Sequence, residues 1–191
     1  MTDWPDPRLT PPDPKRYSER QQEVHEAIAS GPRGGVRGPL AIWLHRPELA
    51  AAAQALGRYC RYDTLLEPRL SELAILVTAR VFGSEYEWHA HKPIALKAGL
   101  SEAVVEAIRA GKTPPFERRD EALVHAFAEA AHRGRNVSEA LYDEAVAMLG
   151  AEAVVDLVGL LGYYTLISLT INIFGVSPPA GCARELSGED R

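Results

Sequence analysis

A long run of residues from Leu157 to Ala183 without any Asp, Glu, Lys or Arg is the feature that most constrains the fold. About twenty apolar residues can cross a bilayer, but a helix that is apolar on all sides can also lie in a protein core or a subunit interface. The second reading is favoured because no other segment supports a membrane protein. We therefore expect a long buried helix over 151–174, no membrane partner, and self-association through this helix.

Composition and charge narrow the class of protein. Hydrophobic residues make up 46% of the 191 residues and charged residues 25%, which is ordinary for a soluble domain with a sizeable core. A net charge of −5 without a basic stripe argues against a nucleic-acid partner. Cys60 and Cys182 form no CxxC pair, and the N-terminus lacks the basic and apolar regions of a signal peptide. We expect a cytoplasmic location.

Helical spacing recurs along the chain, whereas the strand–helix alternation of an α/β protein is missing. The pattern predicts helices over 17–30, 47–62, 68–82, 84–98, 101–110, 117–133, 138–149 and 151–174. We therefore expect an all-α fold in three parts: an extended N-terminal arm over 1–16, a single domain over 17–181, and a mobile tail over 182–191.

The loop over 31–39 contains four glycines and two prolines around Arg33 and Arg37 and can cradle an anion. It lacks the Lys-Ser/Thr ending of a phosphate-binding loop, so a plain connector is the favoured interpretation.

The segment over 83–91, which reads Gly-Ser-Glu-Tyr-Glu-Trp-His-Ala-His, carries the densest chemistry. On a helix, Glu87 and His91 lie four residues apart and meet, whereas His89 and His91 project about 200° apart and cannot share a metal ion. A carboxylate beside an imidazole sets its tautomer and raises its basicity, as general acid–base chemistry requires. A surface ion pair has the same spacing, so both readings stay open. Pro93 is expected to kink the helix beside this pair.

Three stretches of the chain together match one family. They are Ser-Glu-Leu-Ala-Ile-Leu-Val-Thr-Ala-Arg over 71–80, the segment over 83–101, and the later Gly-Tyr-Tyr-Thr-Leu, Asn-Ile-Phe and Pro-Pro-Ala-Gly over 162–181. In these stretches the chain resembles the carboxymuconolactone decarboxylase and alkyl hydroperoxidase D-like (AhpD-like) superfamily. The resemblance covers residues 20–181 and implies an AhpD-like helical bundle that assembles into trimers or hexamers.

The resemblance also distinguishes two branches of this family. In the peroxidase branch a glutamate precedes a Cys-x-x-Cys and a histidine; Glu72 and His91 take the outer positions here, while Ser84 and Glu87 replace the two cysteines. Peroxidase chemistry of that kind needs an attacking and a resolving thiol, which neither replacement supplies. The decarboxylase branch carries a Glu-x-x-x-His without cysteines, and Glu87 with His91 matches it.

The resemblance therefore implies cofactor-free decarboxylation, or a related lyase or isomerase step, on a small unsaturated carboxylic acid or lactone. His91 is expected to donate the proton, Glu87 to orient His91, and Glu72 to act as a second acid. The residues expected to bind substrate are Ser84, Tyr86, Trp88, His89 and Arg80, with Lys92 as a further positive candidate.

Three alternatives remain open at this point. The first is a metal enzyme with Glu72, Glu87 and His91 as ligands, a thin set because the motif is not repeated. The second is a peroxidase-related oxidoreductase that has lost its CxxC, and the third is a non-enzymatic oligomeric module. The favoured interpretation requires neither a metal nor an organic cofactor.

Overall fold

The computed structural model describes residues 4, 6–32 and 34–186 of the chain. Within these residues all regular structure is helical and no strand is formed, which confirms the all-α prediction. The α-helices of this part are α1 (Glu19–Ala29), α2 (Pro39–Trp43), α3 (Pro47–Arg58), α4 (Pro68–Phe82), α5 (Glu85–Lys97), α6 (Glu102–Arg109), α7 (Arg119–Gly134), α8 (Glu139–Leu149) and α9 (Ala151–Phe174). A 3₁₀ turn at Pro14–Arg16 precedes α1, and a π-helical turn, η2, at Tyr59–Asp63 follows α3.

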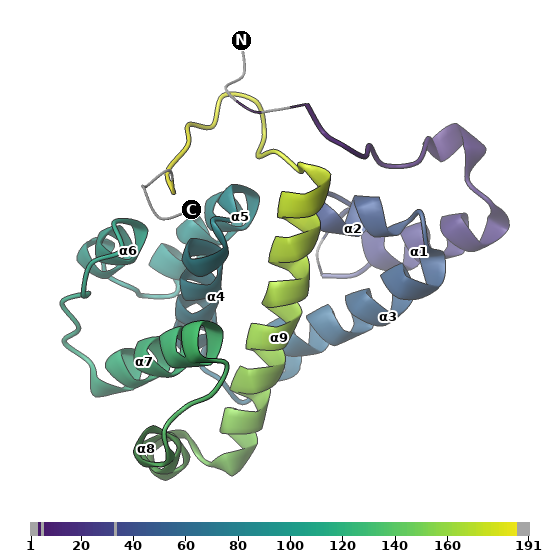
Figure 1. Ribbon diagram of the computed structural model, residues 1–191. Helices are drawn as coiled ribbons and strands as arrows, with labels where there is room; N and C mark the ends of the chain where they lie inside the picture. The colour runs from purple at the N-terminus through teal and green to yellow at the C-terminus, as the bar shows by residue number, and fades with distance from the viewer. Residues whose placement is uncertain (1–3, 5, 33, 187–191) are drawn as a thin grey trace.

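Two helices organise the bundle. The longest, α9, runs between α1–α3 on one side and α4–α8 on the other (Figure 1). It packs against α2, α3, α4, α5, α8 and η2, while α4 packs against α5, α6, α7 and α9. Leu73, Ile75 and Leu76 on α4 and Leu157 and Leu160 on α9 are completely or almost completely buried, so the two helices share one core.

Most helix ends follow local sequence signals. Ser18, Ser101 and Ser138 accept hydrogen bonds from backbone N–H groups in the first turns of α1, α6 and α8, as N-cap residues do. Gly83, at φ 60°, ends α4 in the left-handed conformation that favours glycine. The chain reverses there, and α5 therefore lies along α4.

The structure differs from the predicted helices in two places. The helix predicted over 47–62 is α-helical only to Arg58 and continues as the π-helical turn η2, and α2 was not predicted because it is only five residues long. Pro93 lies inside α5, which continues past it to Lys97, and the kink there stays a prediction.

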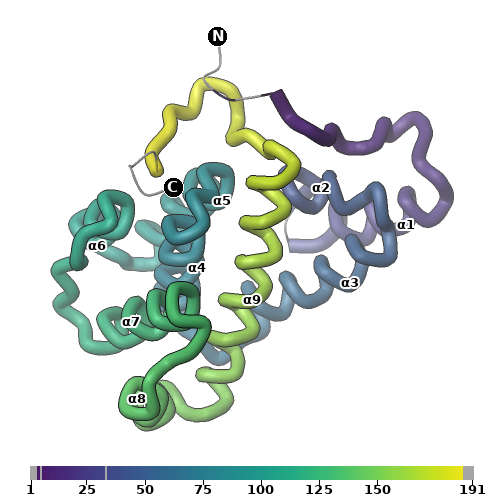
Figure 2. Tube along the Cα trace, viewed as in Figure 1, coloured from purple at the N-terminus to yellow at the C-terminus, as the bar shows by residue number. Residues whose placement is uncertain are grey.

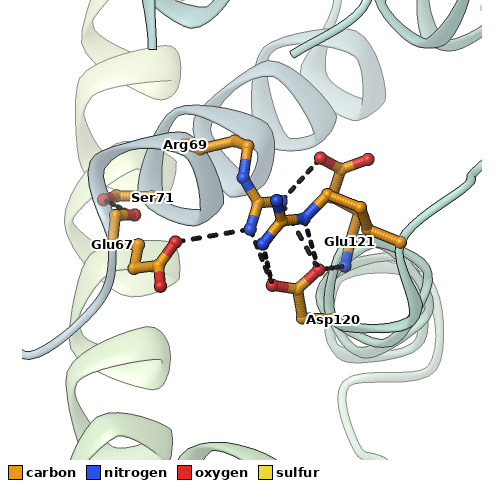
Figure 3. Close-up of polar contacts among 6 residues, drawn as sticks. Glu67, Arg69, Ser71, Asp120 and Glu121 are labelled. Atoms are coloured by element: carbon orange, nitrogen blue, oxygen red, sulfur yellow. Dashed lines mark hydrogen bonds and ion pairs between the residues drawn. The ribbon is translucent and has the colours of Figure 1, made fainter. Parts of the chain in front are cut away.

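Buried charge ties α4 to α7. Arg69 near the start of α4 donates from Nη2 to Asp120 Oδ2 and from Nη1 to Glu121 Oε1, both at 2.6 Å, and Glu67 Oε2 lies 3.4 Å from Nη2 (Figure 3). The side chain is 7% exposed, so this arginine is buried but fully engaged by carboxylates.

The helix expected to be buried on all sides is covered only in part. Among the described residues α9 is the one helix long and apolar enough to cross a membrane, and 61% of its most apolar window is buried inside the protein. Its remaining face is apolar and exposed, with Val155 at 71%, Val158 at 55% and Ile173 at 52%.

Both terminal segments lie at the same end of the bundle (Figure 2). The N-terminal arm is attached there, because Arg8 N donates to Phe174 O at 2.9 Å. Residues 182–186, which we expected to be mobile, contact α5: the backbone N–H groups of Glu185 and Leu186 donate to the carboxylate of Glu85 at 3.0 and 2.9 Å. The rest of the expected tail, 187–191, lies outside the described residues.

Candidate functional site

Two carboxylates hold one imidazole in the interior of the bundle. His91 Nδ1 lies 2.6 Å from Glu72 Oε2, and His91 Nε2 lies 2.9 Å from Glu87 Oε1. The three residues are only 4–7% exposed. The structure therefore brings the three expected catalytic residues together, with His91 between the two acids.

The contact between Glu87 and His91 follows from local helix geometry, whereas the contact between Glu72 and His91 follows from helix packing. Glu87 and His91 are four residues apart on α5 and share one face of that helix. Glu72 lies on α4 and meets Nδ1 of the same ring only because α4 and α5 pack side by side.

A tyrosine from α9 completes the cluster. The hydroxyl oxygen of Tyr164 lies 3.4 Å from His91 Nε2, and the two rings meet edge to face with centroids 5.2 Å apart. Burial and the charge of Glu87 raise the pKa of Tyr164 well above 10, so its phenol stays protonated at neutral pH.

The charge state of His91 is set by two opposing effects. Burial alone lowers the pKa of an imidazole, but the charges and hydrogen bonds of Glu87 and Glu72 outweigh it and raise the pKa of His91 to about 9. At neutral pH the ring is therefore an imidazolium that donates from both nitrogens. In this state it can act as a proton donor and not as a base.

A cavity of about 230 Å³ opens beside one side of the imidazole. Glu87, His91 and Tyr164 line it, whereas Glu72 does not. Glu72 therefore holds Nδ1 of the ring from outside the cavity, whereas the two residues next to Nε2, Glu87 and Tyr164, are part of its wall. The remaining lining residues are Gly35, Arg37, Pro39, Leu40, Arg61, Tyr86, Ala90, Tyr163 and Ile167.

Of the residues expected to bind substrate, Tyr86 lines this cavity. Ser84 precedes α5; its side chain is completely buried, and its Oγ has no hydrogen-bond partner among the described residues. Arg80 lines a separate, larger cavity of about 540 Å³ near the ends of the chain.

The other expected substrate residues face the C-terminal segment. Trp88 Nε1 donates to Glu185 Oε2 at 3.1 Å, and Lys92 Nζ donates to the same atom at 2.5 Å. His89 Nε2 donates to Ala183 O at 2.7 Å. The physical reason is the helical rotation between neighbouring residues of α5, which turns these side chains away from the face that carries Glu87 and His91.

Two arginines on the cavity wall escaped the list of candidates. Arg37 belongs to the glycine-rich loop whose anion-binding potential the sequence did suggest; its companion Arg33 lies outside the described residues. Arg61 comes from the π-helical turn η2, and no sequence signal placed it near His91.

The arrangement favours direct hydrogen bonding over metal binding. Both nitrogens of His91 already lie within hydrogen-bond distance of carboxylates, so no lone pair of the protonated ring is free for a metal. Among the residues that the structure describes, no group of three or more His, Cys, Asp or Glu side chains is placed to hold a metal ion.

Comparison with known proteins agrees with the fold and the motif. Residues 47–132 match the model of the carboxymuconolactone decarboxylase family. The comparison with curated proteins gave no match.

Several solved structures share the whole architecture. The debrominase Bmp8 in complex with 2,3,4-tribromopyrrole superposes with a TM-score of 0.73 at 16% identity, over 93% of this chain and 95% of that chain. An uncharacterised peroxidase-related protein from Silicibacter sp. TM1040 gives 0.73 at 17% identity, over 94% and 96%. An alkylhydroperoxidase AhpD core protein from Ralstonia eutropha JMP134 gives 0.73 at 16% identity, over 92% and 94%.

At these identities the structural matches show the fold alone. The match to the sequence family covers residues 47–132, which include Glu72, Glu87 and His91. The segment over 47–132 therefore matches the carboxymuconolactone decarboxylase family, and the chain as a whole shares the fold of the peroxidase-related and AhpD core structures.

Proposed function

We propose that this protein is an enzyme that carries out cofactor-free acid–base chemistry, decarboxylation or a related lyase or isomerase step, on a small unsaturated carboxylic acid or lactone. One observation carries the proposal: the buried imidazole of His91 is held between two carboxylates and lies on the wall of a small cavity. Strongly perturbed titratable groups in a cavity are typical of active sites.

The geometry suggests roles for Glu72 and Glu87 that differ from the expected ones. Glu72 holds Nδ1 from outside the cavity and is a positioning residue for the ring. Glu87 lines the cavity and accepts from Nε2, so it lies between the imidazolium and a bound substrate. In this arrangement Glu87 and His91 act together as the proton source.

Decarboxylation would proceed as follows. The bond between the carboxylate and its carbon breaks, CO₂ leaves, and the electron pair passes into the conjugated lactone to form a dienolate. The proton on His91 Nε2 then passes to the carboxylate of Glu87 and from it to the dienolate carbon, and the neutral His91 regains a proton from solvent. The neutral phenol of Tyr164 supplies a hydrogen-bond donor to the developing oxyanion.

Thiol chemistry receives less support from the cavity. Its described walls contain no cysteine, since Cys60 is buried elsewhere and Cys182 belongs to the C-terminal segment. Ser84 and Glu87 occupy the positions where the peroxidase branch has its thiols. A peroxidase without an attacking thiolate cannot reduce peroxide by the family route.

The test is the loss of ultraviolet absorbance of 4-carboxymuconolactone with the purified full-length chain. Wild type should turn it over, and Glu87→Gln and His91→Asn should each lower the rate by about a hundredfold or more, as loss of a general acid does. Glu85→Gln is the matched control, because Glu85 is a buried acid on the same helix that binds the C-terminal segment instead.

Turnover that survives both Glu87→Gln and His91→Asn would contradict the proposed acid–base cluster. Absence of turnover by wild type would remove this lactone as the substrate and direct the search to other small unsaturated acids.

A further inference from the structure

Arg61 presents a guanidinium to the cavity beside His91 with part of its hydrogen-bonding capacity unused. The side chain lines the cavity, and its Nε is buried without a hydrogen-bond partner among the described residues. A buried donor without a partner costs free energy, and an anion that paired with this guanidinium would offset that cost.

We infer that Arg61, supported by Arg37, forms an anion-binding site that holds a carboxylate of the ligand next to Glu87 and His91. This inference rests on the proposed function, because it names the residues that would bind the substrate of the same cavity.

A buried arginine elsewhere in the bundle shows what a purely structural role looks like in this fold. Arg69 is engaged by the carboxylates of Glu67, Asp120 and Glu121 at 2.6–3.4 Å (Figure 3). Around Arg61 the carboxylates are committed elsewhere: Asp63 pairs with Arg58 at 3.5 Å, and Glu87 accepts from His91. An arginine with a planar fork of donors suits a carboxylate, which it binds with two parallel hydrogen bonds.

The backbone that carries Arg61 is held in place from α9. The buried carboxylate of Asp156 accepts from the hydroxyl of Tyr59 at 2.6 Å and from the backbone N–H of Leu65 at 2.8 Å, one contact on each side of Arg61. The ring of Tyr62 lies 5.2 Å below the guanidinium carbon. A π-helical turn pinned in this way is typical of functional positions, and it fixes the guanidinium before a ligand arrives.

Charge around the cavity favours an anion although the whole chain is acidic. With His91 protonated, the imidazolium, Arg37 and Arg61 together exceed the charges of Glu72 and Glu87 by one. The chain as a whole carries −5. A local positive excess inside an acidic protein concentrates a small anion at this cavity.

The two arginines occupy different parts of the wall. Arg61 interacts electrostatically with Glu72, Glu87 and the hydroxyl of Tyr164, which places it beside the acid–base cluster. Arg37 lies near Tyr86, and its Nη2 donates to Gly34 O at 3.2 Å in an exposed position. Arg61 is therefore the inner contact for the carboxylate, and Arg37 is an outer cation that attracts it.

The experiment is isothermal titration of the full-length chain with furan-2-carboxylate and with its neutral isostere furan-2-carboxamide. Wild type should bind the carboxylate about tenfold or more tightly than the amide, as expected for a charge-assisted pair. Arg61→Gln should remove that preference while amide binding is unchanged, and Arg61→Lys should restore part of it. Arg58→Gln is the matched control, because it removes an exposed positive charge from the preceding turn.

Glu87→Gln separates this inference from the proposed function. It should abolish lactone turnover, yet it should bind furan-2-carboxylate at least as tightly as wild type, because it removes a negative charge beside the guanidinium. Equal binding of carboxylate and amide by wild type, or an unchanged preference in a folded Arg61→Gln, would overturn the anion-binding site. If Arg61→Gln loses carboxylate binding and wild type does not turn over the lactone, the anion-binding site is supported and the proposed reaction is contradicted.

Discussion

Replacement of Glu72 by glutamine tests the coupling between the two helices of the candidate site. Glu72 accepts from the protonated His91 Nδ1 at 2.6 Å, in a region where all partners are almost fully buried. A hydrogen bond between charged groups contributes about 1.5–3 kcal/mol. Since one pKa unit corresponds to about 1.4 kcal/mol, the pKa of His91 should fall from about 9 by about 1–2 pH units in Glu72→Gln.

The sign of the stability change follows from linkage. The pKa of His91 is higher in the folded protein than its ordinary value of 6.5, so protonation of the ring stabilises the fold fully below about pH 6.5 and ceases to do so as the pH rises through about 9. The destabilisation caused by Glu72→Gln should therefore be about 1.5–3 kcal/mol larger at about pH 6 than at about pH 10.

Two measurements check this prediction. NMR titration of the His91 ring protons gives the pKa directly, and denaturant unfolding of both proteins at the two pH values gives the difference in free energy. Glu85→Gln is the control: it removes another buried acid, but one that holds the backbone of Glu185 and Leu186, and it should leave the pKa of His91 unchanged. An unaltered pKa in Glu72→Gln, or a destabilisation independent of pH, would refute the reasoning.

Three further predictions concern the fold that supports the site. Gly38→Ala should lower the free energy of unfolding by about 1–2 kcal/mol more than Gly34→Ala, as measured by thermal unfolding. Both glycines have positive φ, but an added Cβ at Gly38 would lie 2.4 Å from the ring of Tyr86, whereas the space at Gly34 is open. Equal losses of stability in the two variants would contradict this. Val155→Glu, on the exposed apolar face of α9, should convert a homo-oligomer into smaller species in light scattering, and a monomeric wild type would contradict the proposed self-association. Arg69→Met should lower the free energy of unfolding by about 3–5 kcal/mol, because it leaves the carboxylates of Asp120 and Glu121 without their partner. A loss below about 1 kcal/mol in denaturant unfolding would show that these carboxylates move into solvent instead.

The features predicted well from sequence depend on residues close together in the chain. Helix periodicity and N-cap serines such as Ser138 located most helices to within a few residues. The contact between Glu87 and His91 follows from the helix repeat alone, since residues four apart share a face. The family motif over 71–101 pointed to the same fold.

Other features depend on how helices pack, and the spacing of residues contains no information about them. Glu72 meets His91 because α4 and α5 lie side by side, and Tyr164 joins them from a helix more than seventy residues further along the chain. His89, Trp88 and Arg80 were natural candidates from their neighbourhood in sequence, but His89 and Trp88 bind the docked C-terminal segment and Arg80 lines a separate cavity.

Arg61 shows most clearly what only the tertiary structure decided. In sequence it is one arginine among many, at the end of a predicted α-helix. The π-helical turn, pinned by Asp156 from the other end of the chain, brings its guanidinium to the cavity. The sequence determined which segments are helical, because that depends on local backbone and capping energetics, whereas the charge lining the cavity arises from long-range packing between helices.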